Sequence, residues 1–379
     1  MFWYVLASLA PVLVLVPGAL FGGVWAGIAL GYITCVVIGL DRWTQVPLPA
    51  DEGHKTFTTR LSVGLALTHF ALLALAVWAL VQSRDTPETI ALFMAMGLYF
   101  GQVSNSNAHE LIHNAARGPR RLGVAVFSSL LFGHHASAHP LVHHVWVASA
   151  KDPNSARVGM GFYRFWPRAW IGSFRTGWRA ENLRRARRTP PPSVISHPYL
   201  GYGLASLLSL VAAWMIGGSL GVFILVLLAI YAQAQLILSD YVQHYGLRRR
   251  VDTAGRLEPV GPQHAWNAKP WFSSAMMLNA PRHSDHHQHP ARDFAALRLA
   301  NGMPMLPYSF PVMGALATVP PLWRRVMDHR VAKWAQKPAP GGVHAGDLAH
   351  SRHEKTHVDS ALPDQPAPFG GHPSERRGV

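Results

Sequence analysis

Long apolar runs alternate with short polar segments along this chain. A helix needs about 20 apolar residues to cross the hydrocarbon core of a bilayer, so runs of that length predict membrane spans. We expect spans near 2–17, 19–40, 61–82, 88–108, 199–217 and 219–239. Pro17, Gly18, Gly22 and Gly23 interrupt the first apolar stretch and predict a tight turn there. The pattern indicates an all-α polytopic membrane protein with about six transmembrane helices.

The amino-acid composition agrees with a membrane protein, and it differs between the C-terminal end and the rest of the chain. The chain has 379 residues, of which 49% are hydrophobic and only 14% are charged, which is too apolar for an ordinary soluble enzyme. After about residue 336, Pro, Gly, His, Ser and charged residues replace the apolar pattern. We therefore expect a membrane-embedded domain over 1–336 and a disordered polar tail over 337–379.

Arginine placement orients the predicted spans. Many arginines lie between the fourth and fifth spans, and three more follow the sixth: Arg117, Arg120, Arg121, Arg164, Arg168, Arg175, Arg179, Arg184, Arg185, Arg187, Arg188, Arg248, Arg249 and Arg250. Cytoplasmic loops carry an excess of Lys and Arg, so both segments are expected in the cytoplasm, together with both termini.

The net charge of +15 also invites a nucleic-acid interpretation. No basic motif interleaved with aromatic residues is visible, and a basic face next to anionic lipid headgroups explains the charge better. We therefore expect a lipid bilayer as partner and no nucleic acid, while the basic face offers a docking surface for an acidic electron carrier. Cys35 is the single cysteine, which excludes intramolecular disulfides and thiolate iron–sulfur or rubredoxin-type centres within this chain.

Histidines gather in four motifs on the predicted cytoplasmic side: HELIH at 109–113, HPLVHH at 139–144, DYVQHYGL at 240–247 and RHSDHH at 282–287. His109 and His113 are spaced i, i+4, so they share one helix face and two ring nitrogens can reach one metal ion. The same HExxH string marks zinc metalloproteases, in which the glutamate, here Glu110, is the general base. This motif alone does not decide between the two.

The number of candidate ligands favours two metal ions. A zinc site takes three or four protein ligands, whereas the motifs supply nine histidines: His109, His113, His139, His143, His144, His244, His283, His286 and His287. Neutral imidazoles leave the ions a high positive charge. We infer an oxidising iron site that uses O2 rather than a purely Lewis-acidic centre.

Three carboxylates close to these histidines are candidates for accepting their second ring N–H, namely Glu110, Asp240 and Asp285. Asp152 is a fourth candidate from farther along the chain. Helix capping, or pairing with Arg157 or Arg282, is the alternative for each. Six other histidines are expected to be structural or to lie beside the ligands rather than to bind metal: His69, His134, His135, His197, His264 and His289.

Taken together, the histidine motifs and their flanking segments resemble those of a known family of membrane enzymes. The segments NAHELIHNAARG, HPLVHHVWVASAKDPNSAR, SDYVQHYGL, LNAPRHSDHHQHPARDFAALR and PPLWRRVMDHRV, in this order, resemble the integral-membrane alkane monooxygenases of bacteria, in the membrane fatty-acid desaturase/hydroxylase superfamily. The resemblance covers roughly residues 60–335. HYGL together with RHSDHH distinguishes these hydroxylases from the desaturases.

The resemblance implies a bacterial inner-membrane enzyme with a non-haem centre of two Fe ions held by the nine histidines. It also implies hydroxylation of the terminal methyl of medium-chain alkanes with O2. Electrons would come from rubredoxin and its NAD(P)H-dependent reductase. Departures from the usual family residues are Asn114, Ala138, Val142, Asp240, Gln243 and Ala280-Pro281. They spare every predicted ligand but affect the surrounding polarity and the substrate pocket.

Other functions remain open at this stage. A fatty-acyl or sterol desaturase-hydroxylase, or a xylene-type side-chain monooxygenase, would use the same histidines on another substrate. An intramembrane zinc protease would leave most of the histidines idle. A metal transporter would place its histidines within the spans, whereas here they cluster on one side of them.

Overall fold

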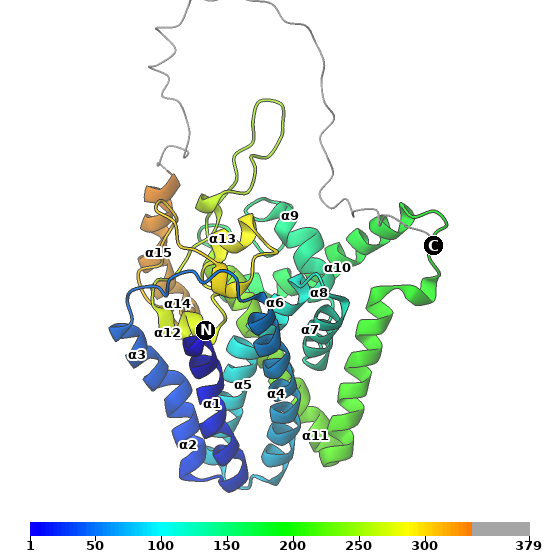
Figure 1. Ribbon diagram of the computed structural model, residues 1–379, viewed down its shortest axis with the longest axis vertical. Coiled ribbons are helices and arrows are strands. Elements are labelled where there is room, and N and C mark those ends of the chain that lie inside the picture. The colour runs from blue at the N-terminus through cyan, green and yellow to red at the C-terminus, as the bar shows by residue number, and fades with distance from the viewer. Residues whose placement is uncertain (336–379) are drawn as a thin grey trace, which may run out of the picture. The chain divides into compact units, whose positions relative to one another are not determined.

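The computed structural model describes residues 1–335, and the predicted tail over 337–379 lies outside this range. The described part is helical, as predicted, and contains only isolated β-bridges in place of strands. Figure 1 shows long N-terminal and central helices below and shorter helices above them. The α-helices are α1 (Phe2–Phe21), α2 (Val24–Gly31), α3 (Val37–Trp43), α4 (Lys55–Gln82), α5 (Thr86–Tyr99), α6 (Asn105–His113), α7 (Arg117–Ser129), α8 (His135–Ala138), α9 (His144–Trp146), α10 (Phe162–Ala186), α11 (Pro198–His244), α12 (Trp271–Met276), α13 (His283–Gln288), α14 (Phe310–Ala317) and α15 (Pro320–Ala335).

The first two predicted spans form a helical hairpin. The turn lies at Gly22 and Gly23, whose φ angles of 61° and 52° fall in the left-handed region that glycine adopts without strain. Pro17 and Gly18 were expected in the turn but lie inside α1. Gly18 packs closely against the second helix, where a Cβ would lie 3.2 Å from the Trp25 carbonyl oxygen. The first helix is therefore four residues longer than the predicted 2–17.

Four helical segments are long and apolar enough to cross a membrane: Phe2–Phe21, Val24–Trp43, Lys55–Gln82 and Pro198–His244. The second includes a π-helical turn, η1 (Tyr32–Val36), between α2 and α3. The predicted span 88–108 is also helical, through α5, the π-turn η2 (Phe100–Ser104) and α6. It is not among the four, and polar residues such as Gln102 and Asn105 lower its hydropathy. The structure thus agrees with the predicted membrane helices. The number of six spans stays a prediction.

The fifth and sixth predicted spans are the two limbs of α11. Gly217 and Gly218 break the helical backbone between them, and Gly218 has a φ of 59°. The green part of α11 descends in Figure 1 and a second limb returns toward the centre. Their close approach requires Gly221, because a Cβ there would lie 2.2 Å from the Ala213 carbonyl oxygen.

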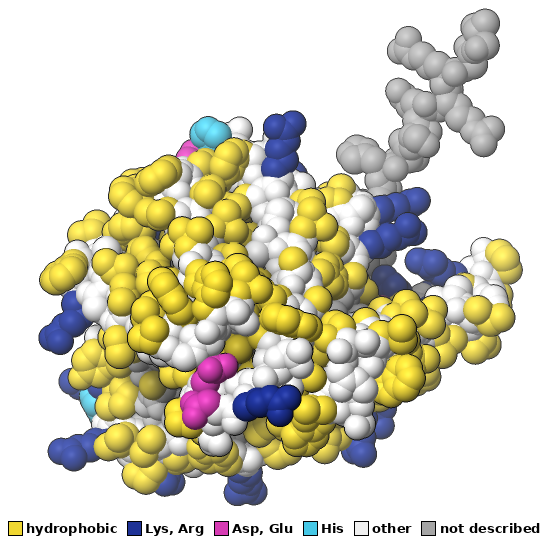
Figure 2. Space-filling model, turned by 90° about the horizontal axis from the view of Figure 1, so that it is seen from below, with side chains coloured by type: hydrophobic (Ala, Val, Ile, Leu, Met, Phe, Trp, Pro, Cys, Tyr) yellow, Lys and Arg dark blue, Asp and Glu magenta, His cyan; other side chains and the backbone are white. Residues whose placement is uncertain are grey.

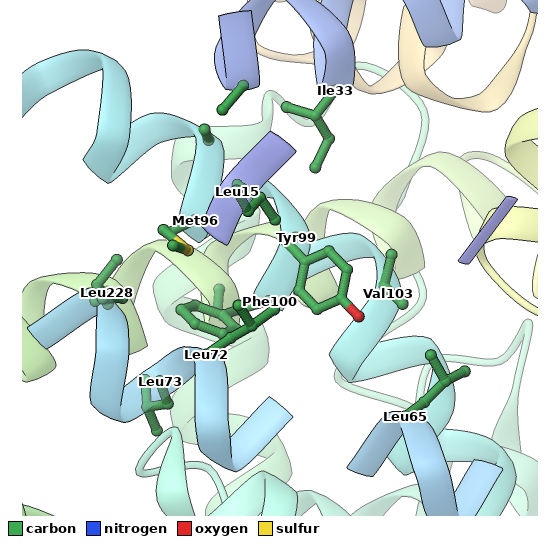
Figure 3. Close-up of a cluster of buried hydrophobic side chains, with 14 of the residues drawn as sticks. Leu15, Ile33, Leu65, Leu72, Leu73, Met96, Tyr99, Phe100, Val103 and Leu228 are labelled. Atoms are coloured by element: carbon green, nitrogen blue, oxygen red, sulfur yellow. The ribbon is translucent and has the colours of Figure 1, made fainter. Parts of the chain in front are cut away.

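Two hydrophobic clusters hold the described part together. One joins α1, α2, α4, α5 and α11, and its labelled members include Leu72, Tyr99 and Phe100 (Figure 3). The other surrounds the C-terminal half of α11 and includes Tyr241 and Trp323. Seen from below, the surface is mostly hydrophobic and Lys and Arg lie mainly around its rim (Figure 2). Such a surface suits contact with lipid rather than water.

Candidate metal centre

All nine predicted ligands converge in two groups. The first contains His109, His113, His139, His144 and His286, and the second contains His143, His244, His283 and His287. Within each group the candidate ligand atoms all lie within 4.8 Å of one another. The two groups thus contain every histidine expected to bind metal and no other residue.

Local helix geometry explains how each motif contributes. His109 and His113 lie one turn apart on α6 and face the first group. The π-turn η3 (His139–His143) then widens the helix and brings His139 and His144 to the same group, five residues apart. His143, between them, faces the second group.

The short helix α13 serves both groups. His283 and His287 are spaced i, i+4 and face the second group, whereas His286 faces the first. The buried Arg282 side chain fixes the start of this helix by donating to the carbonyl oxygens of Leu297 at 2.5 Å and Leu48 at 2.6 Å. Two distant segments therefore determine where α13 lies.

The ring nitrogens face one another closely. His139 Nε2 lies 2.8 Å from His109 Nε2 and 2.9 Å from His144 Nε2. In the second group, His283 Nε2 lies 3.0 Å from both His244 Nε2 and His287 Nε2. Imidazole nitrogens bind metal ions at about 2 Å, so these separations match ligands that share one ion.

Burial favours the neutral form of the candidate ligands other than His143, whose pKa is raised by Asp152. Burial, followed by the neighbouring histidines, lowers the pKa of His283, His286 and His287 well below its usual value. Neutral imidazole is the form that binds a metal. The buried Nε2 atoms of His113 and His143 also have no hydrogen-bond partner among the described residues. A buried polar nitrogen without a partner is costly, so the donor set fits metal ions in both groups.

Only one of the proposed carboxylate partners contacts a predicted ligand. Asp152 Oδ2 lies 2.9 Å from His143 Nδ1 and also accepts a hydrogen bond from the Ser155 hydroxyl at 2.6 Å. Burial raises the pKa of Asp152, but His143 and these hydrogen bonds outweigh it, so the pKa lies below its usual value. Asp152 remains ionised and holds His143 with Nε2 toward the second group.

The other three carboxylates have different partners. Glu110 accepts from the Phe294 backbone N–H at 3.3 Å, and Asp240 accepts from Asn154 Nδ2 at 2.6 Å. Asp285 forms an ion pair with Arg292 and hydrogen-bonds His289 at 3.0 Å. Within residues 1–335, Glu110, Asp240 and Asp285 therefore form no hydrogen bond with a predicted ligand, and their role beside the metal site stays a prediction.

The remaining histidines outside the two groups have structural contacts. His69 lies 2.8 Å from the Ser129 hydroxyl, and His264 lies 2.9 Å from Glu258. His197 accepts from the Tyr199 backbone N–H, while His134 lies 3.4 Å from the Ser173 hydroxyl. His135 stacks on the Phe132 ring and also lines the cavity beside the ligands.

A cavity of about 430 Å³ leads to the histidines. Its lining includes Ile33, Ile38 and Met94 of the predicted membrane helices together with His109 and His283. Sequence reasoning missed Gln102 and Ser106, which also line it. Their spacing of four residues, in one helical run with His109 and His113, was the signal that would have found them.

Comparisons with known proteins show which family the chain resembles. A family model described as fatty acid desaturase matches residues 86–316, which include all nine histidines. Alkane 1-monooxygenase 1 of Pseudomonas aeruginosa is 31% identical over 291 residues, which cover 77% of this chain and 76% of that protein. Alkane 1-monooxygenase of Pseudomonas putida is 33% identical over 286 residues, with coverage of 75% and 70%.

A further relative broadens the range of substrates in the comparison. The xylene/toluene monooxygenase hydroxylase component of Pseudomonas putida is 25% identical over 340 residues, which cover 86% of this chain and 88% of that protein. The matched residues, the membrane helices and the paired histidine groups agree with the resemblance drawn from the histidine motifs. The chain therefore belongs to the fatty acid desaturase family, in its alkane monooxygenase group, and is a membrane-bound oxidoreductase.

Proposed function

We propose that this protein is a non-haem di-iron monooxygenase that hydroxylates the terminal methyl of medium-chain alkanes with O2. The observation that carries the proposal is the convergence of nine histidines in two groups beside a largely apolar cavity. Residues of the membrane helices line the cavity, and an alkane dissolves in the bilayer that surrounds these helices. An alkane lying in the cavity would bring its terminal methyl beside His109 and His283.

Iron is favoured by the chemistry of the donor set and the reaction. Imidazole suits zinc, copper, iron and nickel, but zinc has no redox chemistry to support a monooxygenase. We assign one iron to the group of five histidines and one to the group of four. When bound, these irons would supply the reduction of O2 and the transfer of one oxygen atom to carbon.

The chain's own side chains position and shield the reaction. Apolar residues such as Ile38 and Met94 exclude water and orient an alkyl chain along the cavity. Asp152 accepts a hydrogen bond from His143 Nδ1–H and so leaves Nε2 free to bind a metal. Arg282 holds α13, and therefore three of the nine histidines, in place.

Electrons are proposed to come from a separate protein. Cys35, the single cysteine, supplies no protein-bound iron–sulfur centre, so we propose rubredoxin and its NAD(P)H-dependent reductase as the donor system. The arginine-rich segments support a cytoplasmic site and cytoplasmic termini in a bacterial inner membrane. An acidic redox protein would be attracted to that face.

An aromatic methyl group is the second candidate substrate. The xylene/toluene monooxygenase component aligns with 86% of this chain, more than the alkane monooxygenases do. Hydroxylation of an arene methyl would use the same histidines. Competition between octane and xylene for the same enzyme distinguishes the two substrates.

The test uses the purified full chain in nanodiscs. We expect about two irons per chain and formation of labelled 1-octanol from octane, 18O2, NADH, rubredoxin and its reductase. The His283→Ala variant should lose the product. One zinc per chain and no oxygenated product from octane or xylene would contradict the proposal.

A further inference from the structure

The cavity contains one amide side chain that the protein leaves unpaired. Gln102 lines the cavity, and its buried Oε1 atom has no hydrogen-bond partner among residues 1–335. Ser106, one helical turn nearer to the histidines, lines the same cavity. The two residues form a polar patch, defined here as Gln102 and Ser106.

Other polar side chains of the cavity are held by the backbone. Gln235 donates to the Gly97 carbonyl oxygen at 2.8 Å, and Gln243 donates to the Ala280 carbonyl oxygen at 3.0 Å. Asn105 donates to the Ala232 carbonyl oxygen at 2.8 Å. These amides join helices together. The Oε1 atom of Gln102, by contrast, joins no other helix within residues 1–335, so helix packing does not account for this oxygen.

The backbone aims this patch at the cavity. Gln102 lies in the π-turn η2, and such turns are frequent at functional sites because they redirect side chains. Tyr99, Phe100 and Val103 of the same run turn instead into the hydrophobic cluster, where Figure 3 shows them beside Leu72 and Leu65. One helical run thus separates an apolar packing face from a face that carries Gln102, Ser106 and His109.

An unpaired amide beside an apolar cavity is unfavourable without a partner. An alkane supplies neither a donor nor an acceptor and would leave the amide unpaired. A hydroxyl group supplies both. At a rise of 1.5 Å per residue, Gln102 lies about 10 Å along the helix from His109, so a hydroxyl at one end of an alkyl chain leaves the other end free to reach the histidines.

We propose that Gln102 and Ser106 form a subsite for the hydroxyl group of a primary alcohol, whose remote methyl is then hydroxylated to give an α,ω-diol. The substrate class extends from alkanes to linear alkyl chains with a neutral oxygen group at one end. This inference rests on the proposed monooxygenase function and adds a specificity-determining pair to it.

The test compares an isosteric pair of substrates in the iron-loaded full chain. Nonane and 1-octanol differ by a methyl in place of a hydroxyl, and the products are 1-nonanol and 1,8-octanediol. We expect Gln102→Leu to lower the ratio of kcat/KM for diol formation to kcat/KM for nonane about tenfold, the effect of one hydrogen bond. Ser106→Ala should lower it less. Gln82→Leu, the same change outside the cavity, is the control and should leave the ratio unchanged.

A binding measurement separates this inference from the proposed function. The thermal stabilisation of the protein by 1-octanol relative to nonane, without reductant, should also decrease in Gln102→Leu but not in Gln82→Leu. Nonane hydroxylation with an unchanged ratio in Gln102→Leu would overturn the subsite and leave the proposed function standing. Absence of any oxygenated product, with a Gln102-dependent preference for binding 1-octanol, would overturn the proposed function and support the subsite.

Discussion

Asp152 Oδ2 lies 2.9 Å from His143 Nδ1, and both side chains are fully enclosed by the protein. His143 belongs to the group of four histidines, so this carboxylate is the one that orients a predicted metal ligand directly. Burial opposes a charge on His143, but Asp152 and then Asp240 hold its pKa above the ordinary value. The pair fixes the proton on Nδ1 and directs Nε2 toward the candidate metal.

Asp152→Asn should weaken iron binding in the group of four about 10- to 100-fold, because an amide does not stabilise the same tautomer of His143. Iron content after equilibration against a graded series of chelator concentrations measures this change. Asp252→Asn is the control, since Asp252 pairs with Arg256 on the exposed surface. An unchanged chelator midpoint in Asp152→Asn would show that this carboxylate does not support metal binding.

His283→Ala and His286→Ala should each reduce the iron content from about two to about one per chain, because they remove ligands from different groups. Elemental analysis of the purified variants measures the loss, and the double variant should retain none. His289→Ala should keep both ions, because His289 hydrogen-bonds Asp285 and belongs to neither group. Equal loss of both ions in each single variant would instead indicate one coupled centre.

The metal-free protein should lose stability as the pH falls below about 6.5, the ordinary histidine pKa. His283, His286 and His287 have folded-state pKa values well below this, so the unfolded chain binds more protons in that range. Stability is then fully present above pH 6.5 and decreases toward the folded-state pKa. Thermal unfolding in detergent from pH 8 to pH 5 measures it.

Iron should protect the protein in the same pH series, because a bound metal competes with protons for the imidazoles. The melting temperature of the iron-loaded protein should therefore start to fall at a lower pH than that of the metal-free protein. Parallel curves for the two forms would argue that the histidine groups do not bind the metal.

Gly221→Ala should destabilise the protein by about 1–3 kcal/mol, because the added methyl group meets the Ala213 carbonyl oxygen across the two limbs of α11. Gly201→Ala is the matched control on the same helix, since a Cβ there meets no atom within 4 Å. Thermal unfolding of both variants in one detergent gives the comparison. Equal melting temperatures would mean that the limbs do not depend on this close approach.

The sequence determined the features that depend on local periodicity and chemistry. Apolar runs of bilayer length predicted membrane helices, because each helix satisfies its own backbone hydrogen bonds in lipid. The nine histidines were predicted from spacing, count and resemblance, since residues three or four apart share a helix face whatever surrounds the helix. The predicted spans 199–217 and 219–239 likewise placed a break where Gly217 and Gly218 interrupt α11.

Tertiary structure alone decided how these parts meet. The division into five and four histidines depends on the π-turn at His139–His143, which ordinary helical spacing does not predict. Asp152 contacts a predicted ligand, whereas distant segments engage Glu110 and Asp240, and the nearby Arg292 and His289 engage Asp285. The unpaired Gln102 became visible only once the cavity was known. Local sequence sets which face a side chain occupies, but partners far apart in the chain are chosen by packing.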